Sequence, residues 1–172
     1  MKEPDGDKYF NHFFVDEELG YARIKLDSWE KAVIEEESKR DDFVCWLRNP
    51  SREKWGLCLR RFDGGAAKGF YPDFLIIRNV PGIGYVVDIL EPHRGDLTDN
   101  LSKAKALVEY AQKQPTAPIG RIQLIREGRD NVTGAKRMKR LDLAKSAVKA
   151  RVMAIQTTQE LDNLFLDESL VD

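Results

Sequence analysis

Two acidic residues and one histidine stand at the outer ends of a hydrophobic hairpin, where they could bind a divalent metal ion. Asp73 precedes one apolar run, and Glu91 and His93 follow the next one. The Pro-Gly-Ile-Gly sequence at 81–84 predicts a turn between two strands. If this turn is centred near Gly82, Asp73 lies opposite Glu91 or the proline that follows it. The three side chains are therefore the predicted site.

A further acid, Asp88, lies on the same return strand. It is three residues before Glu91, roughly 10 Å away at about 3.3 Å per residue. Side chains alternate between the faces of a strand, so Glu91 and His93 share one face and Asp88 belongs to the other. Asp88 is therefore only a possible secondary member of the site.

Carboxylate oxygens are hard ligands that suit Mg²⁺ or Mn²⁺. Such an ion can lower the pKa of a bound water and neutralise the charge that develops on a phosphodiester. A second interpretation remains open. Asp73 would then simply begin a strand, and Glu91 and His93 would be solvated residues at a strand end.

The Pro72-Asp73 pair, the hairpin and the Glu91-Pro92-His93 triplet resemble the PD-(D/E)XK nuclease superfamily. Four segments more specifically resemble the C-terminal region of bacterial type III restriction-like DEAD/DEAH-box helicases, and the likeness extends from about residue 29 to 165. These segments are residues 43–50, 71–74, 87–93 and 101–111.

The resemblance implies a restriction-endonuclease-like fold and a metal-dependent endonuclease or exonuclease. The expected cofactor is Mg²⁺ or Mn²⁺, and the expected partners are nucleic acid, with DNA favoured, and a helicase domain or subunit. A role in restriction-modification or antiphage defence follows. The sequence leaves open the strandedness of the substrate and whether the domain forms a homodimer.

One residue departs from the superfamily pattern, because His93 stands where a lysine is expected. The superfamily can supply this lysine from the following helix, so Lys103 or Lys105 could restore the positive charge. They flank the apolar stripe of that helix, one on each side. The resemblance also favours Glu37 as a further metal ligand from the helix before the sheet. Alternatively, the acidic run that contains Glu37 is a solvated helix face.

The missing lysine supports a second hypothesis, in which a catalytically degenerate nuclease fold acts as a nucleic-acid-binding or protein-docking module. A third is a purely structural subunit of a defence complex. Five basic residues are candidates for contact with a phosphate backbone, although each could be an ordinary surface charge. They are Arg48, Lys136, Arg137, Lys139 and Arg140.

Length and composition suit one domain, and the expected strands and helices, together with the family resemblance, favour an α/β fold. The 172 residues, 42% hydrophobic and 33% charged, have a net charge of −1, which by itself does not indicate a nucleic-acid binder. We expect residues 1–172 to form a mixed sheet of about five or six strands with helices on both faces, and residues 1–8 and 167–172 to be flexible. Residues 55–62 are expected to be a strand of this sheet, and residues 63–69 a flexible connector.

Cys45 and Cys58 fit no zinc or CxxC pattern, which favours free thiols in a reducing cytoplasm. No apolar run approaches the ~20 residues that a membrane-spanning helix needs. We therefore expect a cytoplasmic protein with no membrane partner.

Overall fold

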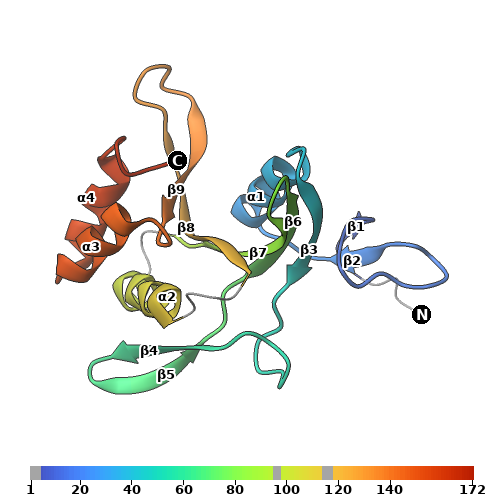
Figure 1. Ribbon diagram of the computed structural model, residues 1–172, viewed down its shortest axis with the longest axis horizontal. Coiled ribbons are helices and arrows are strands. Elements are labelled where there is room, and N and C mark those ends of the chain that lie inside the picture. The colour runs from blue at the N-terminus through green and yellow to red at the C-terminus, as the bar shows by residue number, and fades with distance from the viewer. Residues whose placement is uncertain (1–4, 95–97, 114–117) are drawn as a thin grey trace.

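A mixed β-sheet forms the centre of the computed structural model, which describes residues 5–94, 98–113 and 118–172. Its five strands have the order β3-β6-β7-β8-β9 (Figure 1). Their bounds are β3 (Phe43–Arg48), β6 (Phe74–Val80), β7 (Gly84–Pro92), β8 (Ile119–Arg129) and β9 (Lys136–Asp142). Neighbouring strands are antiparallel except β7 and β8, which are parallel.

Helices cover both faces of this sheet, which confirms the predicted α/β architecture. The helix α1 (Ser28–Ser38) lies on one face. The other face carries α2 (Asn100–Lys113), α3 (Ser146–Ala154) and α4 (Thr158–Leu166). Parallel strands need a crossover connection, and α2 lies between β7 and β8 in the chain.

The start of α1 is fixed by a capping box. The Asp27 carboxylate accepts from the backbone of Glu30, and the Glu30 carboxylate accepts from the backbone N–H of Asp27. Further along the helix, Val33 and Ile34 are buried against the sheet beside Trp46. The capping box and these buried side chains therefore fix the position of α1 on the sheet.

The hairpin of β6 and β7 has the predicted register. Phe74 pairs with Leu90 and Ile76 pairs with Asp88. The turn uses Gly82 at φ +78°, a backbone conformation that glycine adopts at little cost. One step beyond the Phe74–Leu90 pair, the residue before β6 lies beside Glu91 at the same edge of the sheet.

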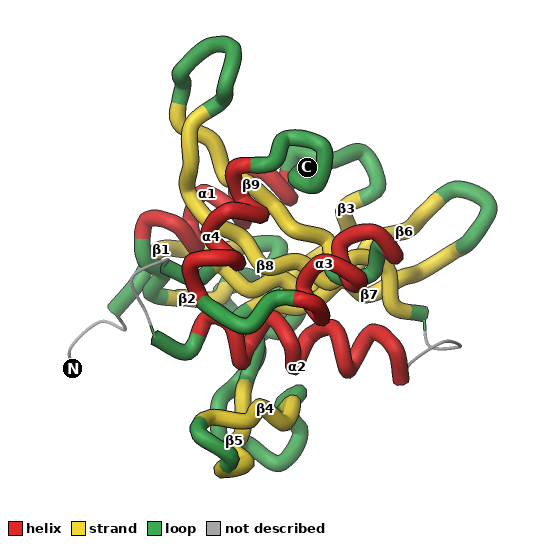
Figure 2. The backbone as a smooth tube through the Cα atoms, turned by 90° about the vertical axis from the view of Figure 1, so that its left-hand side faces the viewer, coloured by secondary structure: helices red, strands yellow, loops and turns green. Residues whose placement is uncertain are grey.

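Two short hairpins lie outside the central sheet. One pairs β1 (Asp7–Tyr9) with β2 (Ala22–Ile24), and the other pairs β4 (Leu59–Asp63) with β5 (Ala66–Phe70). The β4-β5 hairpin projects beyond α2 in Figure 2.

The predictions for the β4-β5 segment were wrong. The Gly-rich segment is not a connector but a tight turn with Gly64 at φ +58° and Gly65 at φ +83°, followed by a strand. A two-residue glycine turn allows the chain to reverse at once, so that β5 pairs with β4. The two strands form a separate two-stranded sheet.

The C-terminal residues are packed rather than free, contrary to the prediction for residues 167–172. Val171 forms a β-bridge with Leu141, and the Asp172 carboxylate accepts from Lys145 at 2.5 Å. At the other end, Asp7 and Lys8 belong to β1, and residues 1–4 lie outside the described residues. Among the described helices, none is long and apolar enough to cross a membrane.

Candidate active site

The two predicted acids meet at the edge of the sheet where β6 begins and β7 ends. The backbone N–H of Asp73 donates to Glu91 Oε2 at 2.8 Å. Glu91 is only 2% exposed and points to the face covered by α2, because it has the same strand parity as the core residue Ile89. The hairpin register therefore places the Asp73 backbone against the Glu91 carboxylate, and the Asp73 charge contributes to raising the pKa of Glu91.

Lys103 completes this group from α2. Its Nζ lies 3.2 Å from Glu91 Oε1 and 5.0 Å from the centroid of the Phe70 ring. The other candidate, Lys105, points elsewhere and donates to the carbonyl of Ile155 at 2.8 Å. Residues two apart on a helix face different directions, so only one of the two could reach the acids. The prediction for Lys105 is corrected accordingly.

His93 lies beside Lys103 but its ring nitrogens are both directed at protein groups. Nε2 lies 2.9 Å from Asp99 Oδ1, and Nδ1 lies 3.4 Å from Lys103 Nζ. The network assigns the proton to Nε2, because a carboxylate accepts and an ammonium donates. Burial, together with the Lys103 charge, lowers the pKa of His93. The neutral ring therefore holds Lys103 in place rather than facing a free water.

The two acids have elevated pKa values because Glu91 is buried and Asp73 lies half-buried beside it. Burial and the neighbouring Asp73 charge raise the pKa of Glu91 to about 8. Burial raises the pKa of Asp73 to about 6, against the lowering effect of Arg48. A pair of acids that share a site in this way favours a proton or a cation between them.

Arg48 connects this site to α1. Its Nη2 lies 2.9 Å from Glu30 Oε1 and 3.8 Å from Asp73 Oδ1. Glu30 is therefore the α1 glutamate at this edge, and it was not predicted from the sequence. The available signal was the Asp27-x-x-Glu30 capping pattern, which fixes a glutamate at the first turn of the helix.

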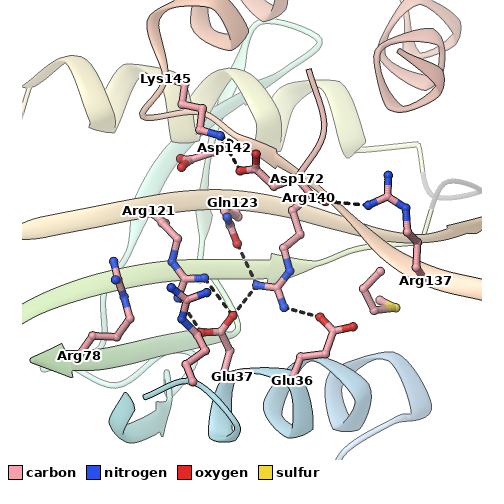
Figure 3. A pocket seen from close by; sticks show the side chains of 12 residues that line it. Glu36, Glu37, Arg78, Arg121, Gln123, Arg137, Arg140, Asp142, Lys145 and Asp172 are labelled. Carbon is pink, nitrogen blue, oxygen red and sulfur yellow. Dashed lines mark hydrogen bonds and ion pairs between the residues drawn. The ribbon is translucent and has the colours of Figure 1, made fainter. Parts of the chain in front are cut away.

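Glu37 does not join Asp73 and Glu91, so its predicted role as a metal ligand is corrected. It accepts from Arg121 Nη2 at 2.6 Å and also from Arg140 Nη1 (Figure 3). Both oxygens of this buried carboxylate are thus engaged by arginines on the α1 face of the sheet.

Asp88 belongs to the same charged network, on the face predicted for it. It is fully buried and accepts from Arg78 Nη2 at 2.8 Å and from Arg121 Nη2 at 2.6 Å. Its partners Arg78 and Arg121 line a pocket of about 650 Å³, together with Arg140 and Glu36 (Figure 3). Asp88 is therefore a structural residue rather than a secondary member of the site.

The basic segment at 136–140 does not form the predicted nucleic-acid surface. It is a strand, β9, whose Lys139 and Arg140 are buried. Lys139 Nζ lies 2.7 Å from Glu168 Oε1, and Arg137 Nη2 lies 2.5 Å from the other oxygen of that residue. Lys136 is the exposed cation of the set, 3.7 Å from Glu127. Charge-pairing inside the fold, which composition cannot show, explains the difference.

Two further residues near the site were also missed. Asp99 orients His93, and its only sequence signal was its position as a possible helix cap. Arg126 follows Ile125, whose carbonyl accepts from the backbone N–H of His93 at 2.9 Å. Arg126 packs its guanidinium 4.4 Å from the centroid of the Phe165 ring.

Asp73 and Glu91 are the residues that could hold a metal ion. Within the described ranges, no group of three or more His, Cys, Asp or Glu side chains is arranged to bind one. Mg²⁺ is nevertheless commonly held by one or two carboxylates together with waters and substrate phosphates. The raised pKa values of the pair fit a cation at this position.

The model of the YagJ family matches residues 10–171. The chain belongs to the YagJ family. A relative, Protein YagJ of Escherichia coli (strain K12), is 33% identical over 165 residues. The match covers 95% of this chain and 63% of the relative, so the chain spans less than two thirds of that protein. No solved structure matches this member of the YagJ family.

Proposed function

We propose that this YagJ-family domain is a metal-dependent nuclease that hydrolyses phosphodiester bonds in nucleic acid, with DNA favoured. The observation that carries the proposal is the contact between Asp73 and Glu91, two acids with raised pKa values, beside the Lys103 ammonium. Two carboxyls and one lysine, drawn from a hairpin and the next helix, match the PD-(D/E)XK pattern that the sequence resembles.

In this proposal Asp73 and Glu91 hold Mg²⁺ or Mn²⁺. The bound ion would activate a water and neutralise charge on the phosphate. Lys103 takes the role of the lysine that His93 replaces and places a positive charge next to the scissile phosphate. His93 and Asp99 act as positioning residues, because their hydrogen bonds fix the Lys103 side chain from one side. Arg48 offers a second positive charge beside Asp73.

The helicase association and the role in restriction or defence rest on the sequence resemblance. The relative is longer than this chain, which leaves room for further domains in such proteins. We propose a helicase domain or a separate helicase subunit as the partner.

A second candidate is a degenerate nuclease fold that binds nucleic acid or docks a protein. One observation favours it. Both oxygens of Glu91 already accept hydrogen bonds from the protein. Oε2 accepts from the backbone N–H of Asp73, and Oε1 accepts from Lys103 Nζ. A carboxylate satisfied in this way has less tendency to bind a metal.

The test is cleavage of linear single- and double-stranded DNA and RNA with Mg²⁺ or Mn²⁺. The native chain is compared with Asp73→Asn, Glu91→Gln and a matched control, Glu109→Gln, whose half-exposed carboxylate pairs with Lys113 one turn further along α2. We expect cleavage by the native chain and the control, and none by the two site variants or with chelator. Cleavage unchanged by Asp73→Asn and Glu91→Gln would contradict the proposal.

Manganese binding in the absence of nucleic acid separates the two candidates. Electron paramagnetic resonance of Mn²⁺ counts free ions during a titration with protein. The nuclease proposal expects binding that Asp73→Asn and Glu91→Gln weaken and Glu109→Gln does not. No binding, combined with no cleavage, would favour the degenerate module.

A further inference from the structure

Three aromatic side chains lie exposed and in contact with one another beside the candidate active site. Phe13, Phe14 and Trp55 are 53%, 53% and 59% exposed, and together they are called the aromatic surface below. The rings of Phe13 and Phe14 have centroids 4.9 Å apart, and those of Phe14 and Trp55 are 5.7 Å apart. Large apolar groups that remain in water and touch one another commonly mark a binding site.

The segment that bears Phe13 and Phe14 runs beside β3, toward the edge of the sheet where the candidate site lies. His12 forms a parallel bridge with Trp46, and the backbone N–H of Phe13 donates to the Trp46 carbonyl at 2.7 Å. The backbone N–H of Arg48 then donates to His12 Nε2 at 3.1 Å. Because this segment runs parallel to β3, Phe13 and Phe14 lie toward the end of the strand that bears Arg48.

The third ring is fixed to the same edge from another direction. The loop that holds Trp55 is closed by Asn49, which exchanges two hydrogen bonds of 2.8 Å with the backbone of Leu57. The backbone N–H of Asn49 also donates to the carbonyl of Asp73 at 2.9 Å. Asn49 therefore links the loop that carries Trp55 to Asp73, the residue that is proposed to hold the metal ion.

The chemistry of this surface suits unpaired nucleobases. Base faces stack on aromatic rings whatever the base, whereas a duplex keeps its bases stacked on each other inside the helix. Two exposed cations, Arg52 and Lys54, precede Trp55 in the same loop, on either side of the exposed Glu53, and could contact the backbone of such a strand. Because the surface is continuous with a site proposed to cut a polynucleotide, we favour a nucleic-acid strand over a protein partner.

We propose that Phe13, Phe14 and Trp55 bind unpaired bases of a single-stranded nucleic acid next to the scissile phosphate. This inference rests on the proposed nuclease function and specifies the substrate as single-stranded or locally unwound. Trp55 and Phe14 contribute stacking faces, and Arg48 Nη2 lies 3.8 Å from Asp73 Oδ1.

The test measures binding by fluorescence anisotropy, in chelator so that no cleavage occurs. The probes are labelled single strands of about 12 nucleotides, within the usual site size for such surfaces, in DNA and RNA forms and as the matching duplex. The variants are Phe14→Ala and Trp55→Ala, both at exposed positions. The matched control is Tyr85→Ala, which removes a 68% exposed ring at the opposite, turn end of the β6-β7 hairpin.

We expect the single strand to bind more tightly than the duplex, and each site variant to raise its Kd by about 5- to 100-fold. Tyr85→Ala should leave the Kd unchanged. The inference is overturned if the duplex binds as tightly as the single strand, if no probe binds, or if Phe14→Ala and Trp55→Ala behave like Tyr85→Ala.

A parallel cleavage assay separates failure of this inference from failure of the proposed function. Asp73-dependent cleavage of a duplex that persists unchanged in Trp55→Ala would overturn the single-strand inference alone. Cleavage unaffected by Asp73→Asn would overturn the nuclease proposal, whatever the aromatic variants do to binding.

Discussion

Lys103 Nζ lies 3.2 Å from Glu91 Oε1, although one residue belongs to a helix and the other to the strand before it. The ammonium also lies 3.6 Å from Asp99 Oδ2. It is thus surrounded by two acids and the neutral ring of His93. A positive charge therefore lies beside Glu91, even though the triplet at the strand end carries histidine.

The first prediction concerns this lysine. Lys103→Met should lower the single-turnover cleavage rate by about 100-fold or more, because it removes a preorganised charge from the transition state. The matched control is Lys105→Met, which loses one hydrogen bond to the Ile155 carbonyl at a cost of about 1 kcal/mol in stability. Equal rates in the two variants would rule out the proposed role of Lys103.

The second prediction is a pH dependence of stability that arises at Glu91. Its pKa is about 8 in the folded state, whereas an unfolded glutamate has a pKa of about 4.3. Between these values the folded state binds more protons than the unfolded state, so the free energy of unfolding falls as pH rises. Urea denaturation in chelator at about pH 5 and about pH 8 measures this change.

Glu91→Gln provides the control for that measurement. The amide does not titrate, so the variant should lose less stability between the two pH values than the native chain does. Added Mn²⁺ should stabilise the native chain more at the higher pH, because the ion and the proton compete for the same carboxylates. Parallel stability curves for the two proteins would contradict the pKa shift.

The third prediction tests His93 and Asp99 as a unit. A shift of about 1 Å in the position of a reactive side chain can lower the reaction rate by about 100-fold. His93→Asn should therefore slow cleavage by about 10- to 100-fold. Because Asp99 holds the His93 ring in addition to its own 3.6 Å contact with Lys103, adding Asp99→Asn to this variant should cause less loss than Asp99→Asn causes alone. Additive losses measured in the full double-mutant cycle would show that the two residues act independently.

The fourth prediction separates structure from metal binding on the α1 face. Glu37→Gln should destabilise the fold by about 3 kcal/mol, because Arg121 and Arg140 lose a buried counter-charge. Glu36→Gln is the control, since this acid also pairs with Arg140 but is 47% exposed, and it should cost about 0–1 kcal/mol. Neither variant should alter Mn²⁺ affinity, and a loss in Glu37→Gln alone would return Glu37 to the metal site.

Local pattern in the sequence was enough to determine the hairpin and its register. The turn at 81–84 and the two apolar runs placed Asp73 opposite Glu91 or Pro92 and assigned Asp88 to the other face. This succeeded because strand side chains alternate strictly and a tight turn fixes the pairing of everything beyond it. The mixed sheet with helices on both faces followed from the same periodicities.

Only the tertiary structure decided which distant side chains reach the acids. Lys103 and Lys105 flank the same apolar stripe of α2. Which of the two reaches Glu91 depends on how α2 lies against β7, and the local sequence pattern does not determine this. The same holds for Glu30 and Glu37, which lie at opposite ends of α1. Long-range packing fixes these distances, because each contact joins elements that the chain brings together only on folding.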